Sequence, residues 1–121
     1  MVMHIPKKGE IWYVDPDPTS GKELRNSHYF IVVSEQVLNK ALGVSICCPI
    51  SIGGNAARSQ SVTVAIDGNS TKSGKISGVI LCHQVIALDL AARGAKYSTE
   101  AESYLIDEVV MKLIDLIDPQ S

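Results

Sequence analysis

The chain has few of the features that mark membrane, secreted or metal-binding proteins. Its three cysteines, Cys47, Cys48 and Cys82, are odd in number and show neither a C-x-x-C pair nor zinc-ligand spacing. That pattern disfavours a disulfide framework and a metal site, and it predicts buried thiols. No apolar run approaches the ~20 residues that a membrane-spanning helix needs. The first ten residues also lack the apolar core of a signal peptide. We therefore expect a cytoplasmic protein that needs neither metal nor cofactor.

An excess of positive charge is also absent. The chain has 11 Lys and Arg residues against 13 Asp and Glu, a formal net charge of −2. Proteins that coat nucleic acid are normally basic, because neutralising phosphates supplies much of their affinity. The balance therefore disfavours such a coat protein, and it gives no support for binding to an anionic membrane. A nuclease that holds a few phosphates in a local basic groove stays compatible with this charge.

The chain that remains is of ordinary globular composition. Its 121 residues are 45% hydrophobic and 20% charged, which predicts one domain over residues 1–121. Short β-rich runs predict at least five strands, at residues 11–14, 29–33, 44–50, 62–66 and 79–82. Residues 85–90 continue the last strand or bend to a neighbour. We expect Trp12 in the core and His4 in a disordered terminus.

The hydrophobic period changes near the C-terminus. Leu105, Val109 and Leu113 form one apolar row, and spacings of three and four residues predict an amphipathic helix. Thr99 and Glu102 have the spacing of a capping box at its start. Closing the strands on themselves would remove exposed edges, and the helix would cover an open end. The pattern therefore predicts a mainly β fold, a small barrel with a C-terminal helix.

Three sequence blocks resemble the MazF/PemK (Kid) family of type II toxins. The first is G-E-I-W-Y-V at 9–14, followed by D-P-T-S-G at 17–21 and Glu23. The second is P-I-S-I-G-G-N-A-A-R at 49–58. The third is G-V-I-L-C-H-Q at 78–84, followed by Asp89 and A-R-G at 92–94. All three occur in order over roughly residues 8 to 117, which argues against chance similarity.

This resemblance implies an SH3-like barrel of the CcdB/MazF type and a homodimer. It implies a toxin that cleaves single-stranded RNA at short sequences without a metal ion, and a cognate antitoxin that occupies the substrate groove. Contact with DNA is expected only indirectly, through the antitoxin complex. The candidate RNA-binding residues are Glu10, Lys22, Glu23, Arg25, Gly53, Gly54, Asn55 and Arg58.

Metal-free RNA cleavage needs a base for the ribose 2′-hydroxyl, an acid for the leaving oxygen and a donor for the phosphoryl oxygens. The candidate catalytic residues are His28, Ser51 and His83. His28 stands where relatives have a catalytic Arg, and Ser51 matches their catalytic Thr. Leu81 and His83 stand where PemK-type members have an Arg and an Asp. Losing a charge-stabilising donor typically costs about 10²–10³ in rate.

Each candidate also has a structural alternative. His28 could simply flank a strand, Ser51 could cap a turn, and His83 could be a hydrogen-bonded core residue. Glu10 could be a solvated carboxylate at a strand end. The glycines of 53–54 could serve only the chain reversal. Arg93 is expected to be structural.

Two other functions compete with the nuclease. Leu81 suggests a catalytically weakened module that still binds an antitoxin and acts as a sponge or repressor component. A gyrase poison of the CcdB type would share the fold. Such proteins carry a tryptophan in their C-terminal tripeptide, whereas the only Trp here is Trp12, which disfavours that reading.

Overall fold

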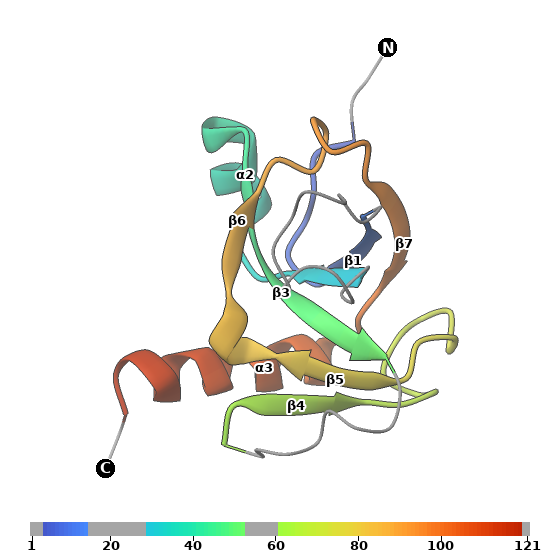
Figure 1. Cartoon of the computed structure of the whole chain (residues 1–121), viewed down its shortest axis with the longest axis vertical. Coiled ribbons are helices and arrows are strands. Elements are labelled where there is room, and N and C mark those ends of the chain that lie inside the picture. Colours follow the sequence, from blue (N-terminus) through green and yellow to red (C-terminus); the bar gives the residue numbers. More distant parts are fainter. Residues whose placement is uncertain (1–3, 15–28, 53–60, 120–121) are drawn as a thin grey trace.

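The protein is built on one strongly curved antiparallel sheet. We describe it from a computed structural model, which defines residues 4–14, 29–52 and 61–119. The strands are β1 (Glu10–Tyr13), β2 (Tyr29–Val32), β3 (Ser45–Ile52), β4 (Thr63–Ile66), β5 (Gly78–Leu81), β6 (Ile86–Leu88) and β7 (Lys96–Glu100). Their hydrogen-bonded order is β4-β5-β3-β2-β1-β7, and β6 pairs with the first half of β3. Figure 1 shows the strands curling around a central space, with α3 across the lower end.

The fold class predicted from the sequence, mainly β with a C-terminal helix, is confirmed. The sheet is barrel-like rather than a closed ring, because its path ends at β4 on one side and β7 on the other. A single bridge between Thr71 and Ala101 links the segment after β4 with the end of β7. Strand β3 is longer than predicted and continues through Ser51 to Ile52.

Two elements were missed by the sequence analysis. Helix α2 (Gln36–Leu42) has only seven residues, too few for a period to stand out, and ends at Gly43 in the left-handed conformation. Strand β7 reads Lys-Tyr-Ser-Thr-Glu and is exposed over most of its length. Its polar sequence carries no strand signal, and its pairing with β1 holds it in the sheet.

The predicted capping box at the last helix is wrong. Thr99 lies within β7 opposite Ile11, and its hydroxyl accepts a hydrogen bond from the backbone N–H of Ser73. Helix α3 (Ser103–Ile117) begins directly after Glu102 without a side-chain cap. Sheet pairing with β1 competes for the residues that the capping motif would have used. The predicted apolar rows of the helix are confirmed, with Leu105 and Val109 fully buried.

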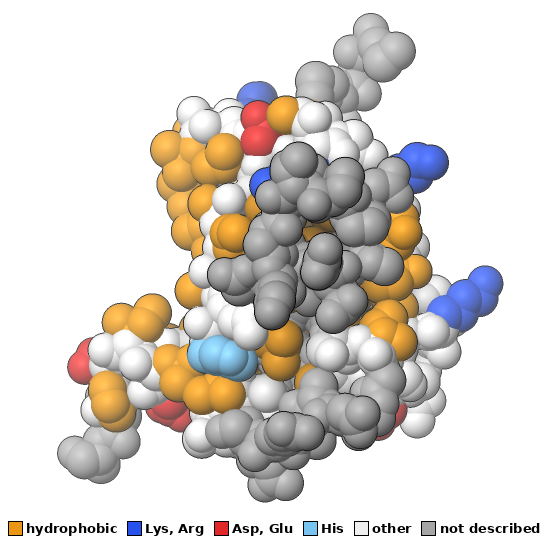
Figure 2. Space-filling model, viewed as in Figure 1, with side chains coloured by type: hydrophobic (Ala, Val, Ile, Leu, Met, Phe, Trp, Pro, Cys, Tyr) orange, Lys and Arg blue, Asp and Glu red, His pale blue; other side chains and the backbone are white. Residues whose placement is uncertain are grey.

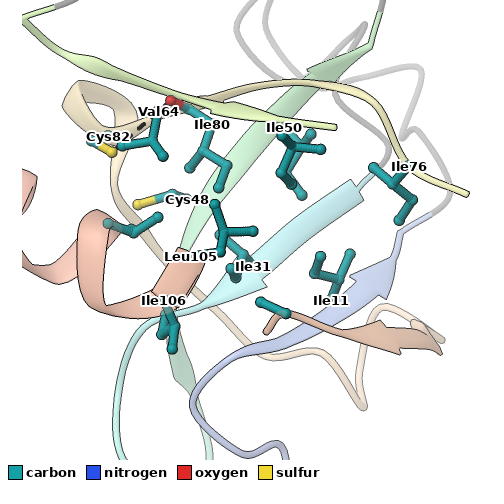
Figure 3. Packing of buried hydrophobic residues seen from close by; sticks show 13 residues of the cluster. Ile11, Ile31, Cys48, Ile50, Val64, Ile76, Ile80, Cys82, Leu105 and Ile106 are labelled. Atoms are coloured by element: carbon teal, nitrogen blue, oxygen red, sulfur yellow. Dashed lines mark hydrogen bonds between the residues drawn. The ribbon is translucent and has the colours of Figure 1, made fainter. Parts of the chain in front are cut away.

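Helix α3 and one face of the sheet enclose the main hydrophobic core. Figure 3 shows Ile11, Ile31, Ile50 and Ile80 pointing from four neighbouring strands toward Leu105. The cross-strand register pairs Ile11 with Ile31 and Ile50 with Ile80, and Ile31 lies opposite Cys48, two residues from Ile50. Burying a side chain of this size contributes roughly 1.5–3 kcal/mol, so this face fixes the register of the whole sheet.

A second cluster lies on the opposite face. Trp12, Phe30 and Cys47 belong to it, together with Leu88 of β6 and Leu90 after it. The prediction that Trp12 is a core residue is confirmed, since only 7% of it is exposed. All three cysteines are buried free thiols, also as predicted. No helix in the described part of the chain is long and apolar enough to cross a membrane.

Candidate functional site

Ser51 is the second-last residue of β3, a strand that pairs with β2 on one side and with β5 on the other. It pairs with Val79 of β5 and is half-buried. Side chains alternate along a strand, so Ser51 shares a face with Pro49, which pairs with Phe30 of β2. The alternative that Ser51 caps a turn does not hold, because it is a ladder residue. Its hydroxyl is held on a rigid element, as a catalytic group requires.

Gly78 sets the close approach of β5 to Ser51. A Cβ atom placed on Gly78 would lie 2.1 Å from the carbonyl oxygen of Ser51. No other residue leaves room for that oxygen, so glycine at this position keeps the backbone of Ser51 where it is. Gly78, which begins the third sequence block, is therefore required for a steric reason: a side chain there would displace the backbone of Ser51.

His83 lies just beyond the end of β5 and not beside Ser51. It belongs to the short 3₁₀ helix η1 (Cys82–Gln84), which directly follows β5. Four positions separate it from Val79, the partner of Ser51, which corresponds to roughly 10 Å along the chain direction. Its side chain is exposed and lies 3.4 Å from the amide nitrogen of Gln84. The alternative that His83 is a core histidine is therefore wrong.

Leu81 is a half-buried residue at the end of β5. It pairs with Thr63 of β4. Its side chain extends from the same face as Val79 and Ser51, because residues two apart in a strand point the same way. The position thus lies between Ser51 and His83, and it presents an apolar group there.

Glu10 lies at the opposite end of the sheet face from Ser51. Its side chain is 8% exposed, so the alternative of a solvated carboxylate is wrong. One carboxylate oxygen accepts hydrogen bonds from the backbone N–H of Lys7 at 2.8 Å and from the indole N–H of Trp12 at 3.2 Å. The other lies 2.9 Å from Nε2 of His4. Glu10 thereby ties the N-terminal segment to β1.

His4 is an ordered part of the structure, and the expectation of a disordered terminal residue is wrong. Besides contacting Glu10, its ring stacks on Tyr97 at 5.4 Å and meets the edge of Trp12 at 5.1 Å. The turn that brings residue 4 back to residue 10 leaves no periodic signal, so the sequence could not reveal this cluster. Half of the imidazole side chain is still exposed, at 48%.

Most of the candidate site residues lie outside the described residues. The candidate catalytic residue among them is His28, and the candidate RNA-binding residues are Lys22, Glu23, Arg25, Gly53, Gly54, Asn55 and Arg58. The described positions that flank them share one edge of the sheet. Tyr13 pairs with Tyr29, and Tyr29 pairs with Ile50, next to Ser51. The described residues Tyr13 and Tyr29 therefore lie at the same end of the sheet as Ser51.

Charge is unevenly distributed over the described residues. Segment 102–118, which contains α3, has five acidic residues against Lys112 alone, whereas the other described residues have seven Lys and Arg against five Asp and Glu. Figure 2 shows the basic side chains in the upper part and beside β7, away from α3. The sheet side is therefore the more favourable one for a polyanion. Within the described ranges, no three His, Cys, Asp or Glu side chains are grouped to hold a metal ion.

The thiols near the site are inert by burial. Desolvation raises the pKa of Cys47 to about 12. The pKa of Cys48 is raised by a hydrogen bond with Cys82 and by burial, and the same hydrogen bond lowers the pKa of Cys82. Because all three side chains are enclosed, we assign them to the core and not to chemistry.

Comparison with known proteins adds an independent finding. Residues 7–117 match the family model described as "PemK-like, MazF-like toxin of type II toxin-antitoxin system". The chain is 30% identical over 111 residues to the endoribonuclease PemK of Escherichia coli, covering 92% of this chain and 81% of the relative. It is 33% identical over 113 residues to the endoribonuclease toxin ChpB of Escherichia coli strain K12, covering 93% and 94%.

Solved structures agree on the fold. The crystal structure of MazF from Deinococcus radiodurans superposes with a TM-score of 0.77 at 24% identity, covering 95% of this chain and 98% of that one. MazF in a MazE–MazF complex from the same organism gives a TM-score of 0.70 at 22% identity, with coverage of 94% and 96%. At these identities the structures support the fold alone.

Proposed function

Because the chain belongs to the PemK-like, MazF-like toxin family of type II toxin–antitoxin systems, we propose that it is a metal-independent endoribonuclease that cuts single-stranded RNA. The observation that supports this most is the family match across residues 7–117. The hydroxyl of Ser51 on a rigid strand, at the position that the resemblance assigns to catalysis, is consistent with it. We further propose that residues 1–121 form one toxin domain, that it acts in the cytoplasm and that it blocks translation by cutting messenger RNA.

The proposed reaction needs no group beyond the RNA and the protein side chains. The ribose 2′-oxygen loses its proton to a base and attacks the adjacent phosphorus, and the bond from phosphorus to the 5′-oxygen breaks. The products are a 2′,3′-cyclic phosphate and a 5′-hydroxyl that has taken up a proton. Ser51 donates a hydrogen bond to a phosphoryl oxygen. Of His28 and His83, one accepts the proton of the 2′-hydroxyl and the other donates a proton to the leaving 5′-oxygen. Lys22, Arg25 and Arg58 neutralise phosphates along the strand.

Position 81 distinguishes the active enzyme from the alternative, a weakened module that only binds its antitoxin. Leu81 presents an apolar group between Ser51 and His83 and supplies no cation to the transition state. Its environment can accept a longer side chain, because it is half-buried. If the natural protein is weakened at this point, Leu81→Arg raises cleavage by about 10²-fold or more. An unchanged rate in an active protein excludes the weakened reading.

The direct test is cleavage of single-stranded RNA in EDTA by the purified protein, with sequencing of the RNA ends. We expect fragments with cyclic phosphate ends, and about a 10²-fold slower reaction for Ser51→Ala. Ser98→Ala is the matched control, because Ser98 is an exposed strand serine of β7. Intact RNA under conditions in which PemK of Escherichia coli cleaves it contradicts the proposal.

The histidines are tested by pH. An imidazole that accepts a proton in the reaction is lost as a base once it is protonated, so the rate should fall below about pH 5.5. His83→Ala and His28→Ala are expected to lose cleavage while keeping the melting temperature of the parent, because His83 is exposed. A flat rate between pH 5 and 8 removes histidine from the mechanism.

We also propose a homodimer and a cognate antitoxin. The last two turns of α3 leave Met111, Ile114 and Ile117 exposed, the last of them at 80%. Apolar side chains in a row on a helix surface are typical of a protein interface, and contact with DNA would then be indirect, through the antitoxin. Light scattering of the wild type and of Met111→Lys tests the dimer. Identical masses for the two at the monomer value contradict this interface.

A further inference from the structure

A cavity of about 360 Å³ lies beside the N-terminal segment, away from Ser51. It is bounded by residues 4–6, by the C-terminal end of α2 and by the turn after β6. Trp12 and Leu90 form part of its apolar wall, and both belong to the second hydrophobic cluster. A volume in this range suits a small organic ligand. Nothing in the proposed cleavage mechanism uses it.

One side of the cavity carries a fixed aromatic surface. His4 lines it and is held from two directions, by the carboxylate of Glu10 and by stacking on Tyr97. Trp12 meets His4 edge to face at 5.1 Å. A flat heteroaromatic group gains most from such a wall, because stacking on aromatic side chains is worth about 1–3 kcal/mol per base in complexes with single-stranded nucleic acid.

Two exposed residues of opposite charge line the cavity. Lys40 lies in the last turn of α2, and its side chain is exposed. Asp89 lies in the turn after β6, where one of its carboxylate oxygens accepts a hydrogen bond from the backbone N–H of Ala92 at 3.0 Å. A carboxylate has about four acceptor positions, so Asp89 keeps acceptor capacity for a ligand. An apolar ligand would desolvate both charges without replacing their partners, which costs free energy.

The cavity shares a sheet face with Ser51. Ser45 lines the cavity and begins β3, while Ser51 lies near the end of the same strand. The two are six residues apart, so they point to the same face at a separation of roughly 20 Å. A few nucleotides of single strand can cover that distance.

We propose that this cavity is a specificity subsite that holds one guanine nucleotide of the bound RNA, a few positions from the cut. The base stacks on the ring of His4 and meets Trp12 edge to face, because the planes of these two rings are 77° apart. Asp89 accepts the two Watson–Crick-edge donors of guanine, and Lys40 pairs with the phosphate. Adenine offers a single donor to the carboxylate and binds more weakly. The inference rests on the proposed nuclease function, because it assigns the subsite to the same substrate.

Free nucleotides test the subsite without any cleavage. Trp12 is the only tryptophan of the chain, so its indole N–H gives a single NMR signal from the cavity wall. Guanosine 5′-monophosphate should shift this signal saturably, and adenosine and uridine monophosphates should bind at least several-fold more weakly. Inorganic phosphate alone should leave the indole unchanged. No saturation by guanosine monophosphate up to about 10 mM, a range where even weak specific sites fill, overturns the proposal.

Two variants separate the base from the phosphate contact. Asp89→Asn keeps an oxygen for the turn at Ala92 and should weaken guanine binding about tenfold, while adenine binding changes little. Asp67→Asn is the matched control, since Asp67 is an exposed aspartate whose carboxylate likewise accepts a backbone N–H in a turn, that of Asn69. Lys40→Gln should weaken all three monophosphates equally, and the exposed Lys75→Gln should not. Equal losses of guanine and adenine in Asp89→Asn would refute the assigned contact.

The outcomes distinguish this inference from the proposed function. If RNA is cut and no nucleotide shifts the indole signal, the nuclease proposal holds and the proposed subsite is wrong. If nucleotides bind and RNA is not cut, the nuclease proposal fails. If N-acetyl-leucinamide saturates the indole shift and the nucleotides do not, the cavity takes a protein side chain and the proposal is overturned. For an active enzyme, Asp89→Asn should also relax one position of the cleaved sequence about tenfold.

Discussion

The carboxylate of Glu10 offers the sharpest test of how the N-terminal segment is held. Two donors, the buried indole N–H of Trp12 and the partly buried backbone N–H of Lys7, share one oxygen of this side chain. His4 binds the other oxygen from a half-exposed position. Changing Glu10 to Gln keeps a carbonyl oxygen for these two donors but removes the charge. Changing Glu10 to Ala leaves both donors without an acceptor.

The two substitutions should lower the free energy of unfolding by different amounts. A hydrogen bond to a charged group contributes about 1.5–3 kcal/mol and one to a neutral group about 0.5–1.5 kcal/mol. Glu10→Gln should therefore lower the free energy of unfolding by about 2 kcal/mol. An unsatisfied buried donor costs about 1–3 kcal/mol, and the partly buried N–H of Lys7 costs less because water can reach it, so Glu10→Ala should lower the free energy of unfolding by about 3 kcal/mol. The contact with His4 adds at most about 1 kcal/mol, because solvent screens it.

Urea unfolding followed by the fluorescence of Trp12 measures both variants. Glu100→Gln is the control, since Glu100 only pairs with Lys7 and Lys72 at the surface, at 3.2 and 3.6 Å. It should cost less than about 1 kcal/mol. At about 4 °C per kcal/mol for a chain of this size, the melting temperatures should fall in the order Glu100→Gln, Glu10→Gln, Glu10→Ala. Equal values for Glu10→Ala and Glu100→Gln refute the reasoning.

Two further predictions concern β3, which carries the candidate serine, and the neighbouring strand β5. Gly78→Ala places a Cβ 2.1 Å from the Ser51 carbonyl oxygen and should cost about 3 kcal/mol or more in urea unfolding. Gly94→Ala, at φ +64 with open space around it, should cost about 1–2 kcal/mol, and a reversed order contradicts the close approach. The pKa of the Cys47 thiol is raised from 9.0 to about 12 in the folded state, so its contribution to stability is complete below pH 9 and is lost as pH rises toward 12. Wild type should therefore lose more stability than Cys47→Ala between pH 9 and 10, and parallel pH profiles would exclude this linkage.

The sequence predicted the elements that have a strong hydrophobic period. The rows of α3 around Leu105 and Val109 repeat every three to four residues, and Ile31 and Ile50 belong to nearly continuous apolar runs. Both patterns reflect burial against many neighbours, and the structure confirms them. Strand β7 was missed because its partner β1 supplies hydrogen bonds that do not depend on side-chain hydropathy.

The candidate site was predictable only in part. Ser51 and its glycine-led neighbour strand came from family resemblance, while the steric reason for Gly78 appears only when β3 and β5 are paired. The contact between His4 and Glu10 depends on a turn that brings together residues six positions apart. Hydrophobic periodicity does not predict such a turn. The cavity beside Trp12 could not be predicted from the sequence either, because its lining comes from four separate segments.

The acidic character of α3 bears on how the molecule meets a polyanion in solution. The net charge repels nucleic acid only weakly, but the excess of negative charge on one side creates a dipole. In the field of an RNA strand this dipole turns the helix outward and the sheet face inward before contact is made. Productive encounters should then become rarer as ionic strength increases, although the protein and its ligand carry net charges of the same sign.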